Sequence, residues 1–271
     1  MGPKKRRRAA NRRETMGGLA KGLAVIRAFT REHAALTLSE IAARARMPAA
    51  TARRCILTLE ELNYVMRKGR SFFLRPKVLE LGAAYIESMD IDRLTQPHLE
   101  ELARVTDDSA AVSVLDGNDI VYVARASVRT LLRLEAHVGS RFPAHVTSMG
   151  RVLLAGLSAD RLNRYFSTQD FVALTDRTVT DRRKVRQLIM ACRRVGYSAV
   201  EDELAYGVVA VAVPIFDLQG QIVAALNSSS HSRRISKARL IRERLPILRK
   251  ASQEISAEIA RVPGLSLNAL R

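Results

Sequence analysis

The placement of positive charge is the strongest constraint that this sequence puts on its fold. Residues 1–77 carry 19 Lys and Arg against 5 Asp and Glu, out of 45 and 27 in the whole chain. The other 194 residues carry 26 basic and 22 acidic side chains and are nearly neutral. A length of 271 residues accommodates about two domains. A compact basic module joined to a larger neutral one is typical of a nucleic-acid reader coupled to a domain that controls it.

Residues 18–62 have the pattern of a helix-turn-helix. Apolar side chains at helical spacing predict a first helix over residues 19–30. Thr37 and Glu40 fit a capping box, in which the hydroxyl and the carboxylate each bond a free backbone amide at the start of a second helix. Pro48 suits the first turn of a third helix, which we expect to reach residue 62.

The outer side of the third helix is suited to the major groove of DNA. Apolar residues recur on one side of it, whereas Arg53 and Arg54 fall on the other, where arginine can bind phosphates or guanine edges. Residues 64–74 then predict a β-hairpin with a basic tip, which makes a winged helix-turn-helix over residues 18–76. The alternative is a small helical domain whose charges are only solvated. The basic side chains that we expect to contact DNA are Arg53, Arg54, Arg67, Lys68 and Arg70.

The segments on either side of this module differ from it in composition. Residues 1–17 are basic and almost free of apolar side chains, which predicts a disordered tail. The tail is either solvated or an arm that adds phosphate contacts or enters a minor groove, and a nuclear-import signal is a further alternative. Residues 77–93 predict a linker helix that is apolar around much of its circumference. Such a helix needs a partner, and we favour a role in dimerisation.

The rest of the chain predicts an α+β effector-binding domain over residues 94–264, followed by a C-terminal tail over residues 265–271. Two hairpins are expected over residues 110–126 and 208–227, and a further strand over residues 131–136. Helical patterns cover residues 97–105, 148–157, 182–195 and 236–261.

Several classes of protein are disfavoured by what the sequence lacks. No stretch approaches the ~18–20 apolar residues of a membrane span, and no apolar segment of a secretory signal follows the basic N-terminus, so we expect a cytoplasmic protein without a membrane partner. Two cysteines, Cys55 and Cys192, are too few for a disulfide framework. No two histidines have the close spacing found in a zinc-binding helix, and the sequence lacks the common catalytic and nucleotide-binding motifs. We therefore expect no catalytic residue, no metal and no cofactor.

Four motifs, in this order, resemble the IclR family of bacterial transcription regulators. They are LSEIA at residues 38–42, TARR at 51–54, PAHVTSMGRVLLA at 143–155, and the block from Gly196 to Asp217 that contains EDE and AVPIFD. Within the family, ARRC at residues 52–55 and RFPAHVTSMGR at 141–151 are similar to regulators of the β-ketoadipate pathway, which respond to protocatechuate, para-hydroxybenzoate or β-ketoadipate.

The resemblance implies a winged helix, a linker helix and a C-terminal domain related to GAF domains. It also implies a homodimer, often a dimer of dimers, bound to double-stranded operator DNA, and it adds Thr51 to the expected DNA contacts. The effector-pocket positions that it implies are Leu131, Ser148, Met149, Ala210, Asn227 and Ser229.

The residues around these positions suit an oxygen-rich, anionic ligand. Arg129 and Arg133 lie beside the predicted strand, and arginine can bind a carboxylate through two parallel hydrogen bonds. His145 precedes a predicted helix, whose free amides and dipole favour an anion. The alternatives are that both arginines are ordinary surface charges and that His145 is a structural histidine.

We therefore predict a ligand-responsive, DNA-binding regulator of aromatic-compound catabolism. One alternative is a repressor that responds to a small aliphatic keto acid, and a remoter one is a nucleic-acid-binding protein that has no sequence preference and no ligand. RNA polymerase is a further candidate partner.

Overall fold

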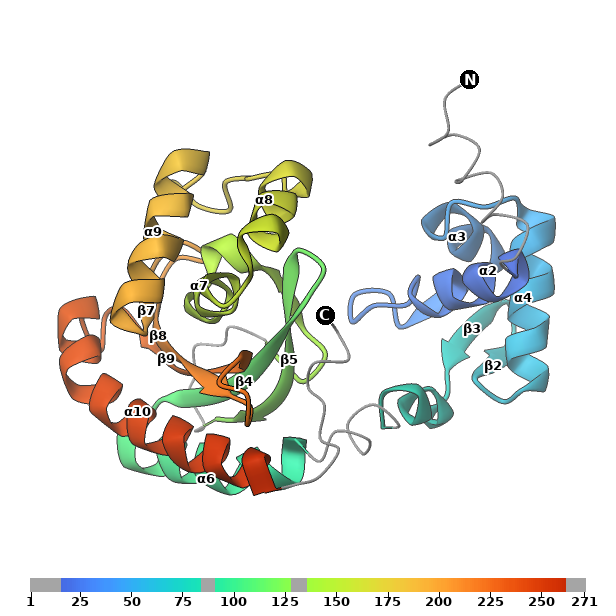
Figure 1. The fold of residues 1–271 in the computed structure, drawn as a ribbon. Helices are drawn as coiled ribbons and strands as arrows, with labels where there is room; N and C mark the ends of the chain where they lie inside the picture. Colours follow the sequence, from blue (N-terminus) through green and yellow to red (C-terminus); the bar gives the residue numbers. More distant parts are fainter. Residues whose placement is uncertain (1–15, 84–90, 128–135, 262–271) are drawn as a thin grey trace. The chain divides into compact units, whose positions relative to one another are not determined.

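The computed structural model describes residues 16–83, 91–127 and 136–261. The chain divides into two compact units, Met1–Ala84 and Tyr85–Arg271, each of which is described by itself (Figure 1). Part of the predicted linker helix, the predicted strand over residues 131–136 except for its last residue, and nearly all of the two predicted tails lie outside the described residues. Within those ranges, no helix is both long enough and apolar enough to cross a bilayer.

Among its described residues, the smaller unit contains a helix-turn-helix core of three packed helices and a small sheet. Its helices are α2 (Gly17–Ile26), α3 (Leu38–Arg44) and α4 (Ala49–Glu61), followed by the 3-10 turn η1 (Pro76–Leu79). The antiparallel sheet has the order β1-β3-β2, formed by Ala35–Thr37, Ser71–Leu74 and Val65–Lys68 respectively. Strand β1 was not predicted, because its three residues directly precede the capping box and are too few to show an alternation.

The predicted local signals explain where these helices begin. The Thr37 hydroxyl accepts a hydrogen bond from the Glu40 amide, and the Glu40 carboxylate accepts one from the Thr37 amide, so the capping box is present. Pro48 is the N-cap of α4, directly before the first helical residue. Val25, Ile41 and Ile56, one from each helix, are fully buried in the common core.

The larger unit is built on one six-stranded antiparallel sheet with the order β6-β5-β4-β9-β8-β7. Its strands are β4 (Ser109–Asp116), β5 (Asp119–Ala126), β6 (Arg141–Pro143), β7 (Ser198–Glu201), β8 (Val208–Phe216) and β9 (Ile222–His231). Its helices are α6 (Ile91–Thr106), α7 (Ser148–Ala155), α8 (Ala159–Thr168), α9 (Arg182–Val195) and α10 (Lys237–Arg261), with the 3-10 turn η2 (Ala144–Val146) before α7.

Helices cover both faces of this sheet (Figure 1). α6 packs on β4 and β5, and α10 packs on β7, β8 and β9, around one apolar core that includes Leu226 and Leu248. α7 packs on the opposite face around a second core that includes Met149 and Ala212, and α9 packs on α7. The sheet is therefore buried between two helical layers, and the unit has the predicted α+β class.

The prediction for α6 was wrong at its start. The sequence predicted a helix from Pro97, but α6 begins at Ile91 and keeps Pro97 in its interior. A proline there removes one backbone hydrogen bond, so a helix boundary was the expected reading. Leu94, before the proline, packs against the same core as Leu99 and Leu102, and this packing favours continuation of the helix.

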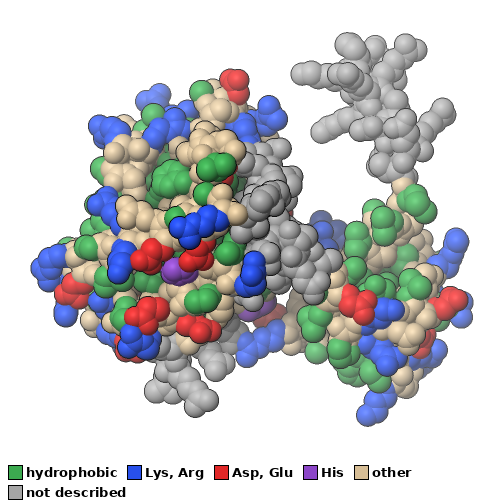
Figure 2. Space-filling view, turned by 60° about the horizontal axis from the view of Figure 1, so that its bottom comes forward, with side chains coloured by type: hydrophobic (Ala, Val, Ile, Leu, Met, Phe, Trp, Pro, Cys, Tyr) green, Lys and Arg blue, Asp and Glu red, His purple; other side chains and the backbone are tan. Residues whose placement is uncertain are grey.

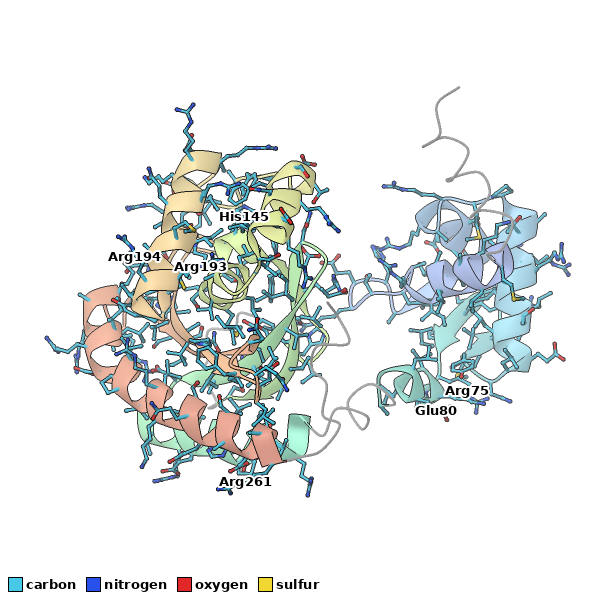
Figure 3. The ribbon with its side chains drawn as sticks, viewed as in Figure 1. Arg75, Glu80, His145, Arg193, Arg194 and Arg261 are labelled. Carbon is cyan, nitrogen blue, oxygen red and sulfur yellow. The ribbon has the colours of Figure 1, made fainter. Side chains whose placement is uncertain are left out.

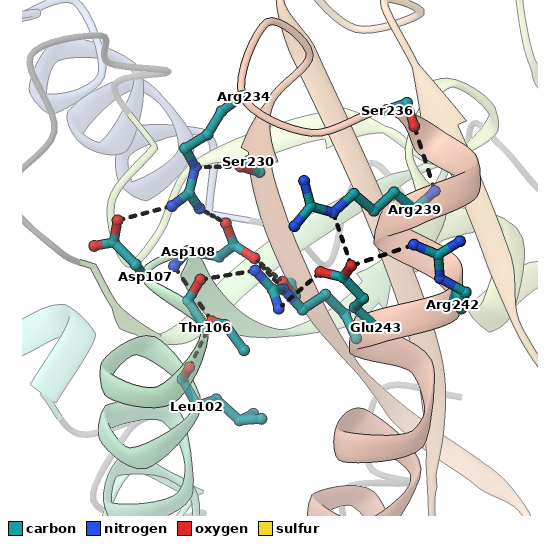
Figure 4. Close-up of polar contacts among 12 residues, drawn as sticks. Leu102, Thr106, Asp107, Asp108, Ser230, Arg234, Ser236, Arg239, Arg242 and Glu243 are labelled. Carbon is teal, nitrogen blue, oxygen red and sulfur yellow. Dashed lines mark hydrogen bonds and ion pairs between the residues drawn. The ribbon is translucent and has the colours of Figure 1, made fainter.

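A buried carboxylate joins the end of α6 to β9 and α10 (Figure 4). The Asp108 side chain is fully buried and forms ion pairs with Arg234 and Arg244, and its Oδ2 lies 2.8 Å from Arg244 Nε. The Ser228 hydroxyl also donates to Oδ2, at 3.1 Å. Arg244 donates in addition to the carbonyl of Thr106. A buried charge is tolerated only when it is paired and hydrogen-bonded in this way.

Candidate functional sites

The third helix of the smaller unit presents two adjacent cations to solvent. Ala52, Ile56 and Leu59 of α4 are buried, whereas Arg53 and Arg54 are exposed. Thr51, in the first turn of α4, is half-buried. The two guanidinium groups are therefore free to reach a ligand outside the unit, which a recognition helix requires.

The basic hairpin is the second exposed feature of this unit. Arg67 and Lys68 lie on β2 and Arg70 in the turn before β3, and all three are exposed. Gly69 adopts a φ of 63°, the left-handed conformation that favours glycine in a tight turn. Arg67 donates to the Gly69 carbonyl at 3.0 Å and lies 5.7 Å from the Phe72 ring centroid, so its guanidinium is held against the hairpin. Lys68 and Arg70 remain at the tip, in a position suited to phosphate contacts.

In the larger unit, strand register places one row of side chains across the sheet. Ala111 of β4 is paired with Arg125 of β5 on one side and with Asn227 of β9 on the other, and Asn227 is paired in turn with Ala212. Residues directly opposite each other point to the same face of a sheet. Ala111 and Ala212 belong to the core beneath α7, so Arg125 and Asn227 also face α7.

Arg125 is a cation without a carboxylate partner among the described residues. Its guanidinium is half-buried and donates to the Ala136 carbonyl at 2.5 Å and to the Ser109 hydroxyl at 3.4 Å. Burial lowers the pKa of Arg125, because it penalises the charged form. Asn227 is 3% exposed, and its Oδ1 has no hydrogen-bond partner among the described residues. Both groups would gain from a polar ligand.

Four of the predicted effector residues lie on this face. Met149 is buried in α7 and accepts a hydrogen bond from the Ser113 hydroxyl at 3.2 Å. Ala210 of β8 is paired with Ser229 of β9, two residues along from the pair of Ala212 and Asn227, so the alternation of strands puts them on the same face. Ser148, also predicted, is the buried first residue of α7. Arg129, Leu131 and Arg133 lie outside the described residues.

His145 contacts a different set of residues (Figure 3). It is 1% exposed within η2, and its ring lies edge-on to Phe171, with centroids 4.9 Å apart. Neither ring nitrogen has a hydrogen-bond partner among the described residues. Burial, together with the nearby positive charge of Arg151, lowers the pKa of His145 from 6.5 to about 4. The imidazole is therefore neutral at pH 7.

The buried, neutral His145 should make the free energy of unfolding depend on pH, and its replacement should remove this dependence. Because the folded-state pKa is below the unfolded value, the folded protein binds fewer protons between these two values, and stability falls as the pH falls through 6.5. Between pH 7 and pH 5, we expect the free energy of unfolding of the parent protein to fall by about 2 kcal/mol more than that of His145→Gln. Urea denaturation at both pH values measures this difference. Equal decreases in the two proteins would contradict the assignment.

An ion pair that the sequence analysis missed holds the turn before α7. Arg151 Nε donates to the His145 carbonyl at 3.0 Å, and Arg151 Nη2 lies 2.5 Å from Glu203 Oε2. Both side chains are almost fully buried. Gly150 lets α7 approach this turn, because a Cβ at that position would lie 2.0 Å from the Ala144 carbonyl oxygen. The EDE motif at residues 201–203 was the available signal, but its partner is 52 residues away in the sequence.

An exposed pair of arginines on a helix-turn-helix with a basic wing, joined to an α+β domain with polar groups facing inward, defines a DNA-binding regulator that senses a small molecule. Residues 18–69 match the model of the IclR helix-turn-helix domain, and residues 83–257 match that of the bacterial transcriptional regulator IclR C-terminal domain. The chain therefore belongs to the IclR family of bacterial transcriptional regulators.

Individual relatives agree with the predicted subgroup. The Pca regulon regulatory protein of Pseudomonas putida is 40% identical over 245 residues, which cover 90% of this chain and 84% of that protein. A transcriptional regulator from Rhodococcus sp. RHA1 matches with a TM-score of 0.82 and 42% identity, over 91% of this chain and 99% of that one. A double mutant of the PobR inducer-binding domain from Acinetobacter, in complex with 3-hydroxybenzoic acid, matches with a TM-score of 0.57 and 32% identity, over 61% of this chain and 97% of that one.

These findings confirm the resemblance to regulators of the β-ketoadipate pathway. They also confirm the predicted function, which is ligand-responsive transcriptional regulation of aromatic-compound catabolism.

Proposed function

We propose that the effector is a hydroxylated aromatic carboxylate that binds on the face of the sheet beneath α7. The observation that carries this proposal is the row of Arg125, Ala111 and Asn227 across three adjacent strands. It combines a half-buried cation without a carboxylate partner among the described residues and a buried amide oxygen without a hydrogen-bond donor. Such groups favour a ligand that supplies a negative charge at one end and a hydrogen-bond donor at the other.

The spacing of the row fits a single aromatic ring. Neighbouring strands lie about 4.8 Å apart, so the backbones of Arg125 and Asn227 are about 10 Å apart, with only the methyl group of Ala111 between them. A carboxylate would accept hydrogen bonds from Arg125 while a ring hydroxyl donates to Asn227 Oδ1. Met149 lies above the same face, and its thioether makes favourable contacts with aromatic rings. The relative that binds 3-hydroxybenzoic acid supports the same ligand class.

Isothermal titration calorimetry on two variants tests this arrangement. Arg125→Met removes the cation and keeps much of the volume. We expect the affinity for 4-hydroxybenzoate to fall by roughly 30-fold or more, because a charge-assisted hydrogen bond contributes about 2 kcal/mol. Asn227→Leu should abolish the preference for 4-hydroxybenzoate over benzoate. It should also leave the protein at least as stable, because it removes a buried oxygen that has no partner in the described residues.

Arg141→Met is the matched control, because Arg141 is an exposed arginine on β6 that pairs with Asp116 and Asp119. Its affinity for the aromatic acids should stay within about twofold of the parent value. Retention of 4-hydroxybenzoate binding in both site variants contradicts the proposed site. Tighter binding of glyoxylate or pyruvate than of every aromatic acid favours the aliphatic keto-acid alternative instead.

The effector regulates transcription by binding unequally to the DNA-competent and DNA-incompetent arrangements of the protein. We propose that Thr51, Arg53 and Arg54 read the operator in the major groove and that Lys68 and Arg70 contact phosphates. The exposure of the four basic side chains supports these roles.

We further propose a homodimer or dimer of dimers, acting in the cytoplasm where operator DNA lies, without catalysis. Exposed apolar side chains on α2 and η1 support self-association: Met16, Leu19, Leu23 and Leu79. Contact with RNA polymerase stays a prediction, as do the domain boundaries at residues 17, 76, 93 and 264.

A further inference from the structure

The net positive charge of the larger unit lies in its outer helical layer. Residues 158–196, which include α8 and α9, carry nine Lys and Arg and four Asp and Glu. The rest of residues 78–271 carries 17 basic and 18 acidic side chains. The whole surplus of positive charge in this part of the chain therefore lies in 39 consecutive residues.

The cations of this layer are not paired with carboxylates in the part of the chain that the structure describes. Several arginines elsewhere in the larger unit pair with carboxylates, among them Arg141, Arg151, Arg234 and Arg244. Across the described ranges, none of the nine basic residues between 158 and 196 forms an ion pair. Three of them instead bond backbone carbonyls or a side-chain amide: Arg182, Arg186 and Arg193.

Contacts between α8 and α9 make the two helices one surface. Arg186 of α9 donates to Asn163 of α8 at 3.1 Å, and its guanidinium lies 4.3 Å from the ring centroid of Phe166. Arg183, Lys184 and Arg194 of α9 are exposed, and Figure 3 shows Arg194 on the outer side of α9. Figure 2 shows Lys and Arg side chains along the upper edge of the larger unit in that view. We call this surface the α8–α9 basic surface.

Three of these cations form the first turn of α9, directly after its acidic N-cap Asp181, and they oppose the helix dipole there. The first turn of α9 consists of Arg182, Arg183 and Lys184 and contains no acidic residue. Cations at a helix N-terminus interact unfavourably with the helix dipole, which prefers acidic side chains there. A ligand that brings negative charge to this end would offset the unfavourable interaction.

We propose that the α8–α9 basic surface binds the phosphate backbone of DNA that flanks the operator. This contact is additional to those of the winged helix. α9 has 14 residues, and its length of about 21 Å spans several phosphates of one strand. An acidic protein partner is disfavoured, because the cores of protein interfaces are depleted of charge and Met190 and Val195 are isolated exposed apolar residues here. Interfaces with DNA are far more positive.

Binding of the full-length protein to two DNA fragments tests the proposal. The long fragment carries the operator with about 25 base pairs on each side, and the short one is trimmed to the base pairs that the variant protects from cleavage. The variant combines Arg183→Gln, Lys184→Gln and Arg194→Gln. We expect its affinity for the long fragment to fall roughly tenfold near 0.1 M salt, and the slope of log affinity against log salt to decrease by up to about 0.9 for each lost contact. Its affinity for the short fragment should stay within about twofold.

The matched control removes the same charge from another surface, through Arg233→Gln, Lys237→Gln and Lys250→Gln. It should bind both fragments like the parent protein, and scrambled flanking sequence should change nothing, because phosphates carry no sequence information. Equal binding of the long fragment by the parent and the α9 variant overturns the proposal. Unchanged DNA binding with loss of transcription in vitro also overturns it and identifies a protein partner. Failure of operator recognition is separate, because it abolishes binding to both fragments.

Discussion

Replacement of Asp108 by alanine is expected to lower the free energy of unfolding by about 3 to 5 kcal/mol, which is a large part of the stability of a typical domain. The side chain of Asp108 is fully buried, and its loss leaves Arg244, which is 16% exposed, with only the longer contact of 3.7 Å to the carboxylate of Glu243. It also removes the acceptor of the Ser228 hydroxyl. Urea denaturation monitored by circular dichroism measures the change.

Two further variants make this result specific to the buried charge. Glu101→Ala removes the partner of Arg104 from an exposed pair on the same helix, α6, and should cost less than about 1 kcal/mol. Ser228→Ala keeps the Asp108 pairs and should have an intermediate effect of about 1 kcal/mol. If Asp108→Ala is as stable as Glu101→Ala, the buried carboxylate does not stabilise the contact between the end of α6, β9 and α10.

The second large effect is expected from Arg53→Ala combined with Arg54→Ala. Each good base contact by arginine contributes about 1–3 kcal/mol, so the double variant should bind its operator at least roughly 30-fold more weakly at physiological salt. The fold should be unaffected, because both side chains are exposed on α4. Gel retardation with the promoter next to the gene, in the presence of competitor DNA, measures the loss.

A charge-matched control separates base recognition from general attraction to DNA. Lys21→Ala with Arg27→Ala removes two exposed cations from the same unit, one on α2 and one at the C-cap of α2. It should weaken operator and non-specific binding equally, which leaves their ratio unchanged, whereas the Arg53 and Arg54 variant should lower that ratio. Unchanged retardation of the operator by the latter variant refutes the assignment of α4 as the recognition helix.

Local signals in the sequence predicted several elements to the residue. α9 was expected over residues 182–195 and β8 over residues 208–216, as observed. Asp181 caps α9 through the Lys184 amide, and Gly196 ends it with a φ of 74°, so residues at the two ends of the helix determine both of its boundaries. The start of α6 was not predictable in this way, because its packing on a distant sheet outweighs the local effect of Pro97.

In the candidate effector site too, some residues were predictable from the sequence, whereas others depend on how distant strands pair. Asn227 and Met149 were found through the resemblance, but Arg125 was overlooked in favour of Arg129 and Arg133, which lie outside the described residues. Arg125 sits on a strand that was predicted correctly. Its position beside Asn227 depends on how β4 pairs with both β5 and β9, and the register between strands more than 100 residues apart leaves no mark in a single sequence.

Strand β9 connects the two helical layers through neighbouring residues. Ser229 points toward α7, and Ser228 points to the opposite face, where it binds Asp108. A rigid strand cannot move one of these side chains without carrying the other. A displacement of β9 that makes room for a ligand beneath α7 therefore also changes the hydrogen bond between Ser228 and Asp108 on the opposite face. Because Asp108 joins the end of α6 to α10, ligand binding on one face is transmitted to the helices on the other.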